Sequence, residues 1–576
     1  MRDSHFFQTS HDLISRVIRV LLVGILCGTA ASLAALILVF TVSAISHSII
    51  AIKQGMPAWL AVLLTISIPA IGGLLVGRIV LRMNSRRPQT PADVLLAVQS
   101  NLKLSTLKLK DNLLNFLAAI IGLASGASLG EYGPMVNIGA TLSARLQKIS
   151  RTEPAVLIGC GVAAAISAGF HAPIAGIIFA HEAIIRHYSL RAFAPITIAA
   201  SISFYISKAV FHTNYLFQFD FTQIIYPGEY AGFIVVGVFS GLLAVVFLRS
   251  ILYARLLASK ISLAQQYKPA IAGLLIGLLA LQLPDILGIG DQLMRQTLSD
   301  STPSALNLGT LLIAKIVAAS VCLGFGFVGG VFSPSLLIGL LFGSLMGLGI
   351  EQLFPYANIP MYAICGMAAL TSPVIGAPLT TIMIVFELTH SYDLTTAVMV
   401  SVVFSNVVSY RLFGRSLFDF QLKSRGFDLS QGRDPLIMDT LSIQDFSHTD
   451  FITITQGRTV KQAIDQLVEA RGNEAFALDH AQRFSGSISL VDLLQLADQQ
   501  GPDAIFDVTI NRHALSFSPG CSVWAAMNKI KGFVGEAVPI VDEHSEQLLG
   551  IIYETDLINA YMQTTRELRN EETANV

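Results

Sequence analysis

Two short, glycine-bounded segments inside long apolar tracts constrain the fold of this chain most strongly. The first reads GEYGP at residues 130–134, and the second reads GVFSP about two hundred residues further on, at 330–334. In both, the glycine, the aromatic, the proline and a later glycine (Gly139, Gly339) keep the same offsets. Glycine permits a tight turn and proline is favoured in the first turn of a helix, so each segment predicts a helix start, near Pro134 in the first copy. A helix start is an anion site, and in hydrocarbon such a break survives only inside protein or against a watery cavity.

The composition places these breaks in a membrane protein. The chain has 576 residues, of which 53% are hydrophobic and only 13% are charged, and this balance is typical of a polytopic membrane protein. No basic stripe with interleaved aromatics indicates nucleic acid. The five cysteines show no CxxC spacing, so neither metal binding nor disulfides are expected, and no nucleophile–base set or phosphate loop indicates an enzyme.

The apolar segments have uneven lengths. After Arg16 and Arg19, a run from about Val20 to Ile50 is too long for a signal peptide and predicts a retained first helix. Leu60–Leu81 and Tyr230–Leu252 are long enough to span the membrane, whereas Gly133–Leu146 and Val331–Leu341 are short and bounded by Gly or Pro. Short, broken helices in corresponding halves point to a transporter-like protein with a site at mid-membrane.

A longer internal repeat supports two related halves. Residues 161–173 (GVAAAISAGFHAP) align without gaps on residues 366–378 (GMAALTSPVIGAP). Each copy continues as an apolar helix that ends in a glutamate, Glu182 or Glu387, nine residues past the proline. The halves therefore form one repeated membrane domain, although the spacing does not tell whether the repeat is inverted.

The pattern of residue types changes after about Gly426, where segments typical of β-branched strands alternate with segments typical of amphipathic helices. We expect a cytoplasmic N-terminal segment (1–13), a membrane domain (14–426), a linker (427–436), two α/β units (437–500 and 501–563) and a disordered polar tail (564–576). The basic group at the end of the membrane domain places the C-terminal part in the cytoplasm; it comprises Arg411, Arg415, Lys423 and Arg425.

Together these segments resemble the CLC family of chloride channels and chloride/proton antiporters, and the tail resembles a pair of CBS domains. The resemblance is carried by GEYGP at 130–134, GGVFSP at 329–334, HAPIAGIIFAHE at 171–182, GAPLTTIMIVFELT at 376–389 and GRSLFDFQLKSRG at 414–426. It implies an all-α polytopic membrane domain built from inverted repeats of broken and tilted helices, plus a cytoplasmic α/β tandem CBS pair. It also implies a homodimer in the cell (inner) membrane with one anion pathway in each subunit and no required cofactor.

The resemblance assigns an anion site. It implies that the backbone N–H groups of Val331 and Phe332 face the central anion, near Tyr132 and Gly133. The family's first selectivity segment, GSGIP, falls on RPQTP at 87–91, where Pro88 stands in place of the serine and Gln89 follows it. The family's inner tyrosine falls on Phe418, which has no hydroxyl.

The gate departs from the family pattern G-(K/R)-E-G-P. The family's gating glutamate falls on Tyr132, while Glu131 occupies the usual basic position. A phenol stays neutral at physiological pH and cannot exchange protons as a carboxylate does, but it can donate a hydrogen bond to a halide. Glu131 is the second candidate for the gate. The alternative role for Glu131 is a structural pair with a nearby Arg or Lys. The antiporters' inner proton-transfer glutamate falls on Ala183.

Several other residues have more than one possible role. Glu182, His181 and His187 are candidates for a proton path, or else helix-end residues facing the cytoplasm or the dimer interface. We expect Glu387 to satisfy buried backbone or to pair with Lys315. In the tail, Thr555 and Asp556 match the CBS pattern that holds an adenosine ribose, and the first unit offers Asp492 without the hydroxyl. Adenine nucleotide (ATP or AMP) at that pair is therefore one hypothesis and a purely structural clamp the other.

These observations predict transmembrane transport of chloride or another small anion, with passive conduction as the leading hypothesis. The alternatives are a chloride/proton antiporter that uses Glu131, and a nucleotide sensor for which the membrane domain is an anchor.

Overall fold

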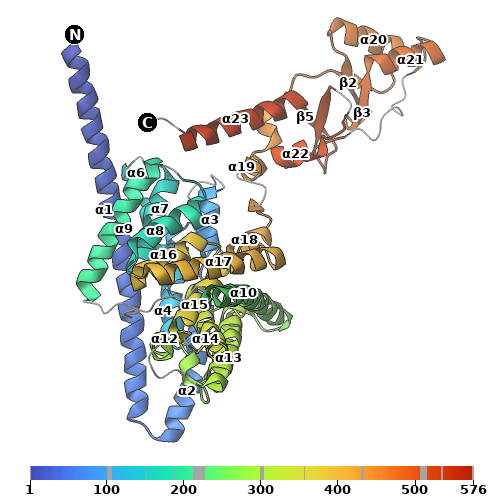
Figure 1. Cartoon of the computed structure of the whole chain (residues 1–576). Helices are drawn as coiled ribbons and strands as arrows, with labels where there is room; N and C mark the ends of the chain where they lie inside the picture. The colour runs from blue at the N-terminus through green and yellow to red at the C-terminus, as the bar shows by residue number, and fades with distance from the viewer. Residues whose placement is uncertain are drawn as a thin grey trace. The chain divides into compact units, whose positions relative to one another are not determined.

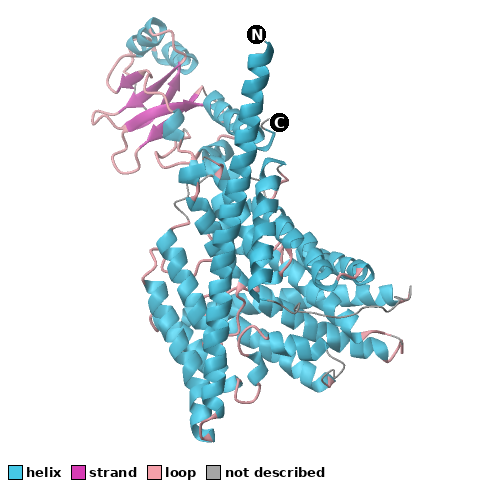
Figure 2. Cartoon of the chain, turned by 90° about the vertical axis from the view of Figure 1, so that its left-hand side faces the viewer, coloured by secondary structure: helices cyan, strands magenta, loops and turns pink. Residues whose placement is uncertain are grey.

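The computed structural model describes residues 2–99, 107–150, 152–188, 190–211, 228–298, 304–355, 357–429, 434–505, 515–533 and 536–573. They form two compact units, which we call the membrane unit (Met1–Gly426) and the C-terminal unit (Phe427–Val576). The division falls where the sequence analysis placed the end of the membrane domain. Figure 2 shows that helices build the membrane unit and that the strands lie in the C-terminal unit.

The first half of the membrane unit contains α1 (Arg2–Gln54), α2 (Ala58–Leu81), α3 (Pro91–Gln99), α4 (Leu109–Ala124), α5 (Tyr132–Arg145), α6 (Gln147–Ser150), α7 (Pro154–Phe170), α8 (Pro173–Phe179) with a π-helical continuation (Ala180–Ile185), and α9 (Leu190–Phe211). The second half contains α10 (Glu229–Lys260), α11 (Lys268–Leu279), α12 (Asp291–Leu298), α13 (Ala305–Gly324), α14 (Phe332–Glu351), α15 (Ile359–Ile375), α16 (Pro378–Thr389), α17 (Tyr392–Leu412) and α18 (Leu417–Lys423), as labelled in Figure 1. Within the described residues, seven helical stretches are long and apolar enough to cross a membrane.

Matched glycine contacts pack the helices of each half together. A methyl group on Gly139 of α5 would stand 2.6 Å from the carbonyl oxygen of Gly161 on α7. In the second half, a methyl group on Gly339 of α14 would stand 2.5 Å from the carbonyl oxygen of Gly366 on α15. Small residues let helix backbones approach this closely, and packing of this kind drives helix association in a membrane. The structure thus confirms the internal repeat.

The two glycine-bounded motifs meet directly. The N–H of Gly130 donates to the carbonyl oxygen of Gly330 at 2.8 Å, and the N–H of Gly330 donates to that of Gly130 at 2.6 Å. The pair forms an isolated antiparallel bridge, so the two copies run in opposite directions, as an inverted repeat requires.

Three expected elements differ from the structure. α1 begins at Arg2, so the expected separate segment 1–13 continues into the first membrane helix. α14 runs to Glu351 instead of ending near Leu341, because the sequence after Leu341 stays apolar and contains no proline to stop it. The expected disordered tail is helical to Thr573 as part of α23, since its glutamates, arginines and leucine are good helix formers.

The described residues of the C-terminal unit form two small sheets. The first has the order β1-β2-β3, with β1 parallel and β3 antiparallel to β2, and the second is the antiparallel pair β4-β5. The elements are α19 (Asp434–Thr440), β1 (Thr453–Thr455), α20 (Val460–Glu469), β2 (Glu474–Leu478), β3 (Phe484–Ser489), α21 (Leu490–Gln500), α22 (Val523–Lys529), β4 (Ala537–Val541), β5 (Leu548–Tyr553) and α23 (Glu554–Thr573). Buried Phe476, Ala537 and Ile551 pack the two sheets against each other.

Gly139→Ala tests the close packing of α5 on α7. The added methyl meets a backbone oxygen that cannot rotate away, so we expect a loss of about 1–3 kcal/mol of stability, seen as a lower melting temperature in detergent. Gly309→Ala is the matched control, because a methyl group on Gly309 of α13 meets no atom within 4 Å. A Gly139→Ala protein that melts at or above the wild-type temperature would contradict this packing.

Candidate functional site

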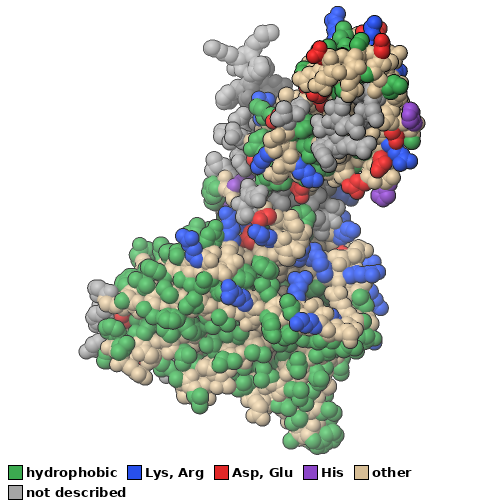
Figure 3. Space-filling view, turned by 90° about the vertical axis from the view of Figure 1, so that its right-hand side faces the viewer, with side chains coloured by type: hydrophobic (Ala, Val, Ile, Leu, Met, Phe, Trp, Pro, Cys, Tyr) green, Lys and Arg blue, Asp and Glu red, His purple; other side chains and the backbone are tan. Residues whose placement is uncertain are grey.

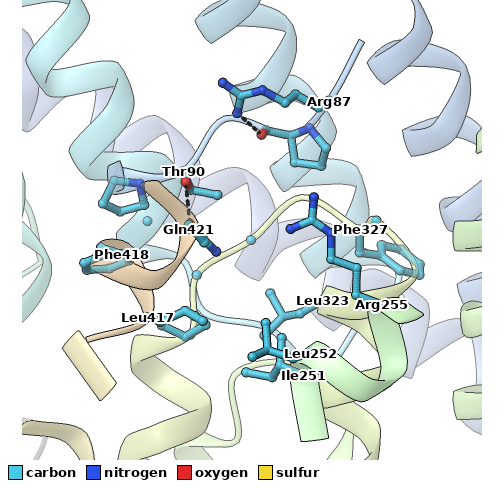
Figure 4. Close-up of a pocket in the computed structure, with 18 of the residues that line it drawn as sticks. Arg87, Thr90, Ile251, Leu252, Arg255, Leu323, Phe327, Leu417, Phe418 and Gln421 are labelled. Atoms are coloured by element: carbon cyan, nitrogen blue, oxygen red, sulfur yellow. Dashed lines mark hydrogen bonds between the residues drawn. The ribbon is translucent and has the colours of Figure 1, made fainter. Parts of the chain in front are cut away.

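A cavity of about 340 Å³ lies in the membrane unit where several helix starts converge. Its wall includes Tyr132 and Gly133 at the start of α5, Val331 and Phe332 at the start of α14, and Leu417 and Phe418 at the start of α18, together with the segment that leads into α3. Figure 4 shows Leu417 and Phe418 on one side of this cavity and Arg255 with Phe327 on the other.

The starts of α5 and α14 are open. In α5 the first bond of the helix ladder runs from the N–H of Met135 to the carbonyl of Glu131, and in α14 it runs from Ser335 to Val331. No side chain of the preceding residue caps either helix. The N–H groups ahead of these bonds therefore have no helix acceptor, and the helix dipoles add positive potential at the same place. This arrangement is suited to a small anion.

The starts of α8 and α16 are closed by carboxylates from the opposite repeat. Glu387 of α16 accepts from the N–H groups of Ile174 and Ala175 at 2.9 and 2.7 Å. Glu182, in the π-helical continuation of α8, accepts from the N–H groups of Leu379 and Thr380, both at 2.9 Å, and from the Thr380 hydroxyl at 2.7 Å. The two repeats thus cap each other reciprocally, and α5 and α14 are left to face the cavity.

Three aromatic rings close the cavity beside the open helix starts. Tyr132 stacks on Phe170 with ring centroids 3.8 Å apart, and Phe332 lies 5.4 Å from Tyr132 and 4.8 Å from Phe170. The Tyr132 hydroxyl donates to the carbonyl of Gly169 at 3.4 Å, which is a long and weak bond. The phenol is therefore buried against its neighbours, and only this weak bond holds the single proton of its hydroxyl.

Basic side chains line the cavity as well. Arg87, Arg255, Lys268 and Arg425 all contribute to its wall. Asp93 of α3 binds two of them, Arg87 at 2.6 Å and Arg425 at 2.9 Å. The remaining positive charge favours entry of anions over cations.

Charged and polar bonds hold α18, which carries Phe418, against the rest of the site. Arg186 makes a two-pronged salt bridge to Asp419, with distances of 2.7 and 3.0 Å. Thr90 donates to Gln421 at 2.9 Å, as Figure 4 shows. Such pairs fix the position of the short helix.

The structure brings most of the predicted site residues together. Pro88, Tyr132, Gly133, Val331, Phe332 and Phe418 line one cavity. Gln89 does not line it: its N–H donates to Asn115 and its side chain donates to Ser85, both at 2.8 Å. Because both groups are already bound, Gln89 supports the loop instead of facing the cavity.

Glu131 lies outside the cavity wall, with only 8% of its surface exposed. The expected Arg or Lys partner is absent: within the described residues no hydrogen bond or ion pair reaches its carboxylate. The structural alternative, a pair of Glu131 with a nearby Arg or Lys, is therefore not found among the described residues. A buried carboxylate without a partner needs another explanation.

The remaining candidates have structural contacts. His181 lies near the carbonyl of His187, with 3.3 Å between Nδ1 and the oxygen. Of the two alternatives for Glu387, the backbone one is confirmed. Lys315 instead donates to the carbonyls of Ile286 and Gly288 at 3.0 and 2.9 Å. It is buried where the expected glutamate does not reach.

Arg255 lines the cavity and Phe170 packs against two of its aromatic residues, but the sequence analysis did not single out either residue. Phe170 precedes the HAP triplet at 171–173, so its place in the repeat was a usable signal. Arg255 lies within α10, and no motif marks it.

In the C-terminal unit, both candidate aspartates cap helices. Asp492 accepts from the N–H and hydroxyl of Ser489 at the start of α21. Asp556 accepts from the N–H of Tyr553 at 3.0 Å and lies 3.1 Å from His448. Thr555 beside it is exposed.

Comparison with known protein families matches residues 72–410 to the model of the voltage gated chloride channel family and residues 505–563 to the CBS domain. Curated relatives include proteins named voltage-gated ClC-type chloride channel ClcB from Escherichia coli O17:K52:H18 and from Shigella flexneri. Each is 28% identical over 358 residues, covering 61% of this chain and 85% of the relative.

Solved structures share the fold. A slow cyanobacterial Cl⁻/H⁺ antiporter matches with a TM-score of 0.63 and 20% identity, covering 71% of this chain and 97% of the other. A eukaryotic CLC transporter matches with a TM-score of 0.64 and 17% identity, covering 94% of this chain and 98% of the other.

Glu182→Ala tests the reciprocal caps. It leaves the N–H groups of Leu379 and Thr380 without their acceptor, which costs about 1–3 kcal/mol, and we expect a lower melting temperature in detergent. Glu182→Gln keeps an acceptor oxygen and should lose less, and Glu387→Ala should reproduce the loss from the other side. Wild-type melting of both alanine variants would contradict the capping role.

Proposed function

The chain belongs to the voltage gated chloride channel family, and we propose that it conducts chloride passively, without obligatory exchange for protons. As a family member it is an integral membrane protein that acts as an anion transporter or channel and not as an enzyme. The passive mode is the proposal.

The phenol of Tyr132 carries this proposal. Tyr132 stands in the position where the family motif has its gating glutamate, and it packs on Phe170 at the wall of the cavity. A tyrosine has an ordinary pKa near 10 and stays neutral through the physiological range, so it cannot load and release a proton with each cycle. Its hydroxyl can donate a hydrogen bond to an anion.

The anion site in this proposal is built from backbone. The N–H groups at the starts of α5 and α14 hold chloride near Gly133, Val331 and Phe332, and Pro88 and Phe418 line its inner approach. Phe418 has no hydroxyl, so it acts as an apolar constriction. We further propose a homodimer with one such pathway in each subunit.

A second candidate function is chloride/proton antiport through Glu131. The observation in its favour is that this carboxylate is buried and has no partner among the described residues. Ionisable groups in such a setting are functional by default. In this version Glu131 carries the proton, and Glu182 and His181 continue the path inward.

Adenine nucleotide at the CBS pair is a separate proposal. Thr555 is exposed beside Asp556, which supports a ribose contact there. The carboxylate of Asp556 already binds the N–H of Tyr553 and His448, so a nucleotide would have to share or displace these contacts.

Paired flux measurements in liposomes separate the two transport modes. With an outward chloride gradient, we expect chloride efflux and no uphill proton uptake, because Tyr132 cannot carry a proton at pH 7. Glu131→Gln should leave both fluxes unchanged. Reproducible proton pumping that disappears in Glu131→Gln while chloride flux persists would instead establish the antiporter.

Tyr132→Ala tests the aromatic wall. Removing the ring that stacks on Phe170 opens the cavity, and we expect chloride flux to rise about tenfold, as for a barrier lowered by about 1.4 kcal/mol. Tyr205→Ala is the control, since Tyr205 is exposed on α9, away from the cavity. An unchanged flux in a folded Tyr132→Ala protein would remove Tyr132 from the pathway, and a lower flux would show that its ring is not the barrier.

A further inference from the structure

An open groove of about 560 Å³ lies at the C-terminal end of α17, apart from the cavity described above. Pro373 of α15 and Asn406 of α17 form its inner part. Asn406 is itself satisfied, because its amide donates to the Ser372 hydroxyl and to the carbonyl of Val402. The mouth of the groove is formed by Arg411 and Arg415.

The mouth carries uncompensated positive charge. Arg411 and Arg415 are exposed, and neither guanidinium makes a hydrogen bond or ion pair within the described residues. A third guanidinium stands beside them, since Arg249 of α10 donates to the carbonyl of Leu412 at 3.1 Å. None of the residues that line the groove is acidic.

The outer wall of the groove is apolar and faces away from the protein. Val407 and Tyr410 are 59% and 58% exposed, and Val403, one turn earlier on α17, is 56% exposed. These side chains lie on a stretch of helix that is apolar enough to cross a membrane. Figure 3 shows the same separation at larger scale, with Lys and Arg side chains gathered toward one end of the hydrophobic surface of the membrane unit.

We propose that this groove binds an anionic phospholipid, with its phosphate between Arg411 and Arg415 and an acyl chain along Val407 and Val403. Guanidinium groups bind phosphate oxygens through paired hydrogen bonds, and tyrosine is favoured at the level of lipid headgroups. Basic pockets between membrane helices on the cytoplasmic side are suited to such headgroups.

Other occupants match the groove less well. Free phosphate or a nucleotide would satisfy the arginines but leave the apolar wall uncovered. A second copy of the chain, meeting this one about a two-fold axis at the groove, would bring the same arginines to the contact and add like charge. Only a ligand with both an anionic head and an apolar tail covers the two parts.

The test uses the full-length protein. After mixed micelles of the protein with phosphatidylglycerol and phosphatidylcholine are prepared, native mass spectrometry counts the lipids retained. We expect retention of phosphatidylglycerol over phosphatidylcholine, and an affinity about 30-fold lower in the Arg411→Gln/Arg415→Gln protein, the factor for about 1 kcal/mol from each arginine. Arg82→Gln/Arg86→Gln is the matched control, since these two arginines are also exposed and lie outside the groove, and it should bind as the wild type does.

Three outcomes would overturn the proposal. Equal phosphatidylglycerol binding in the groove variant and the control variant would place the lipid elsewhere. Displacement of the lipid by millimolar inorganic phosphate would make this a phosphate site. A shift from dimer to monomer in the groove variant would make it a subunit interface. A melting curve of the Arg411→Gln/Arg415→Gln protein that matches the wild type shows that any loss of lipid does not come from unfolding.

Discussion

Main-chain N–H groups at the starts of broken helices must find acceptors in a medium that offers no water. This requirement organises the membrane unit, because four helix starts, those of α5, α8, α14 and α16, follow glycine- or proline-bounded breaks. At α8 and α16 the acceptors are Glu387 and Glu182, each supplied by the other repeat. At α5 and α14 no side chain of the described residues fills that role, and the two starts share one cavity. Two of the four helix starts are thus capped by the protein's own carboxylates, and the other two are left open for a transported anion.

The backbone of the two repeats is more alike than their side chains. Gly130 and Gly330 exchange hydrogen bonds across the centre, and Gly139 and Gly339 pack their helices in the same way. The positions between them differ: Glu131 and Tyr132 stand opposite Val331 and Phe332. An anion site made of backbone tolerates this divergence, whereas proton transfer depends on one particular side chain. Selection for anion passage and selection for proton coupling can therefore act on different atoms of the same motif.

Local chemistry in the sequence was enough to predict the helix starts and the repeat, and the resemblance to the CLC family predicted six residues of the cavity wall. The glycines and prolines act on their own turn, so GEYGP and GVFSP predict where α5 and α14 begin, and the basic end of α17 was visible as charge. Contacts between distant segments were not predictable. The partner of Glu182 lies about two hundred residues away, Asp93 joins Arg87 to Arg425, and Gln89 turns from the cavity because Asn115 binds it. These bonds depend on how helices cross, and no local pattern records it.

Locating the bound anion tests most directly whether the open starts of α5 and α14 form the anion site. Crystals of the full-length protein grown in bromide, measured at the bromine absorption edge, report anions through anomalous scattering without reference to flux. We predict an anomalous peak beside the N–H groups of Val331 and Phe332, near the start of α5, and none at the starts of α8 and α16, which Glu387 and Glu182 occupy. Bromide at those two capped starts, with none between α5 and α14, would contradict it.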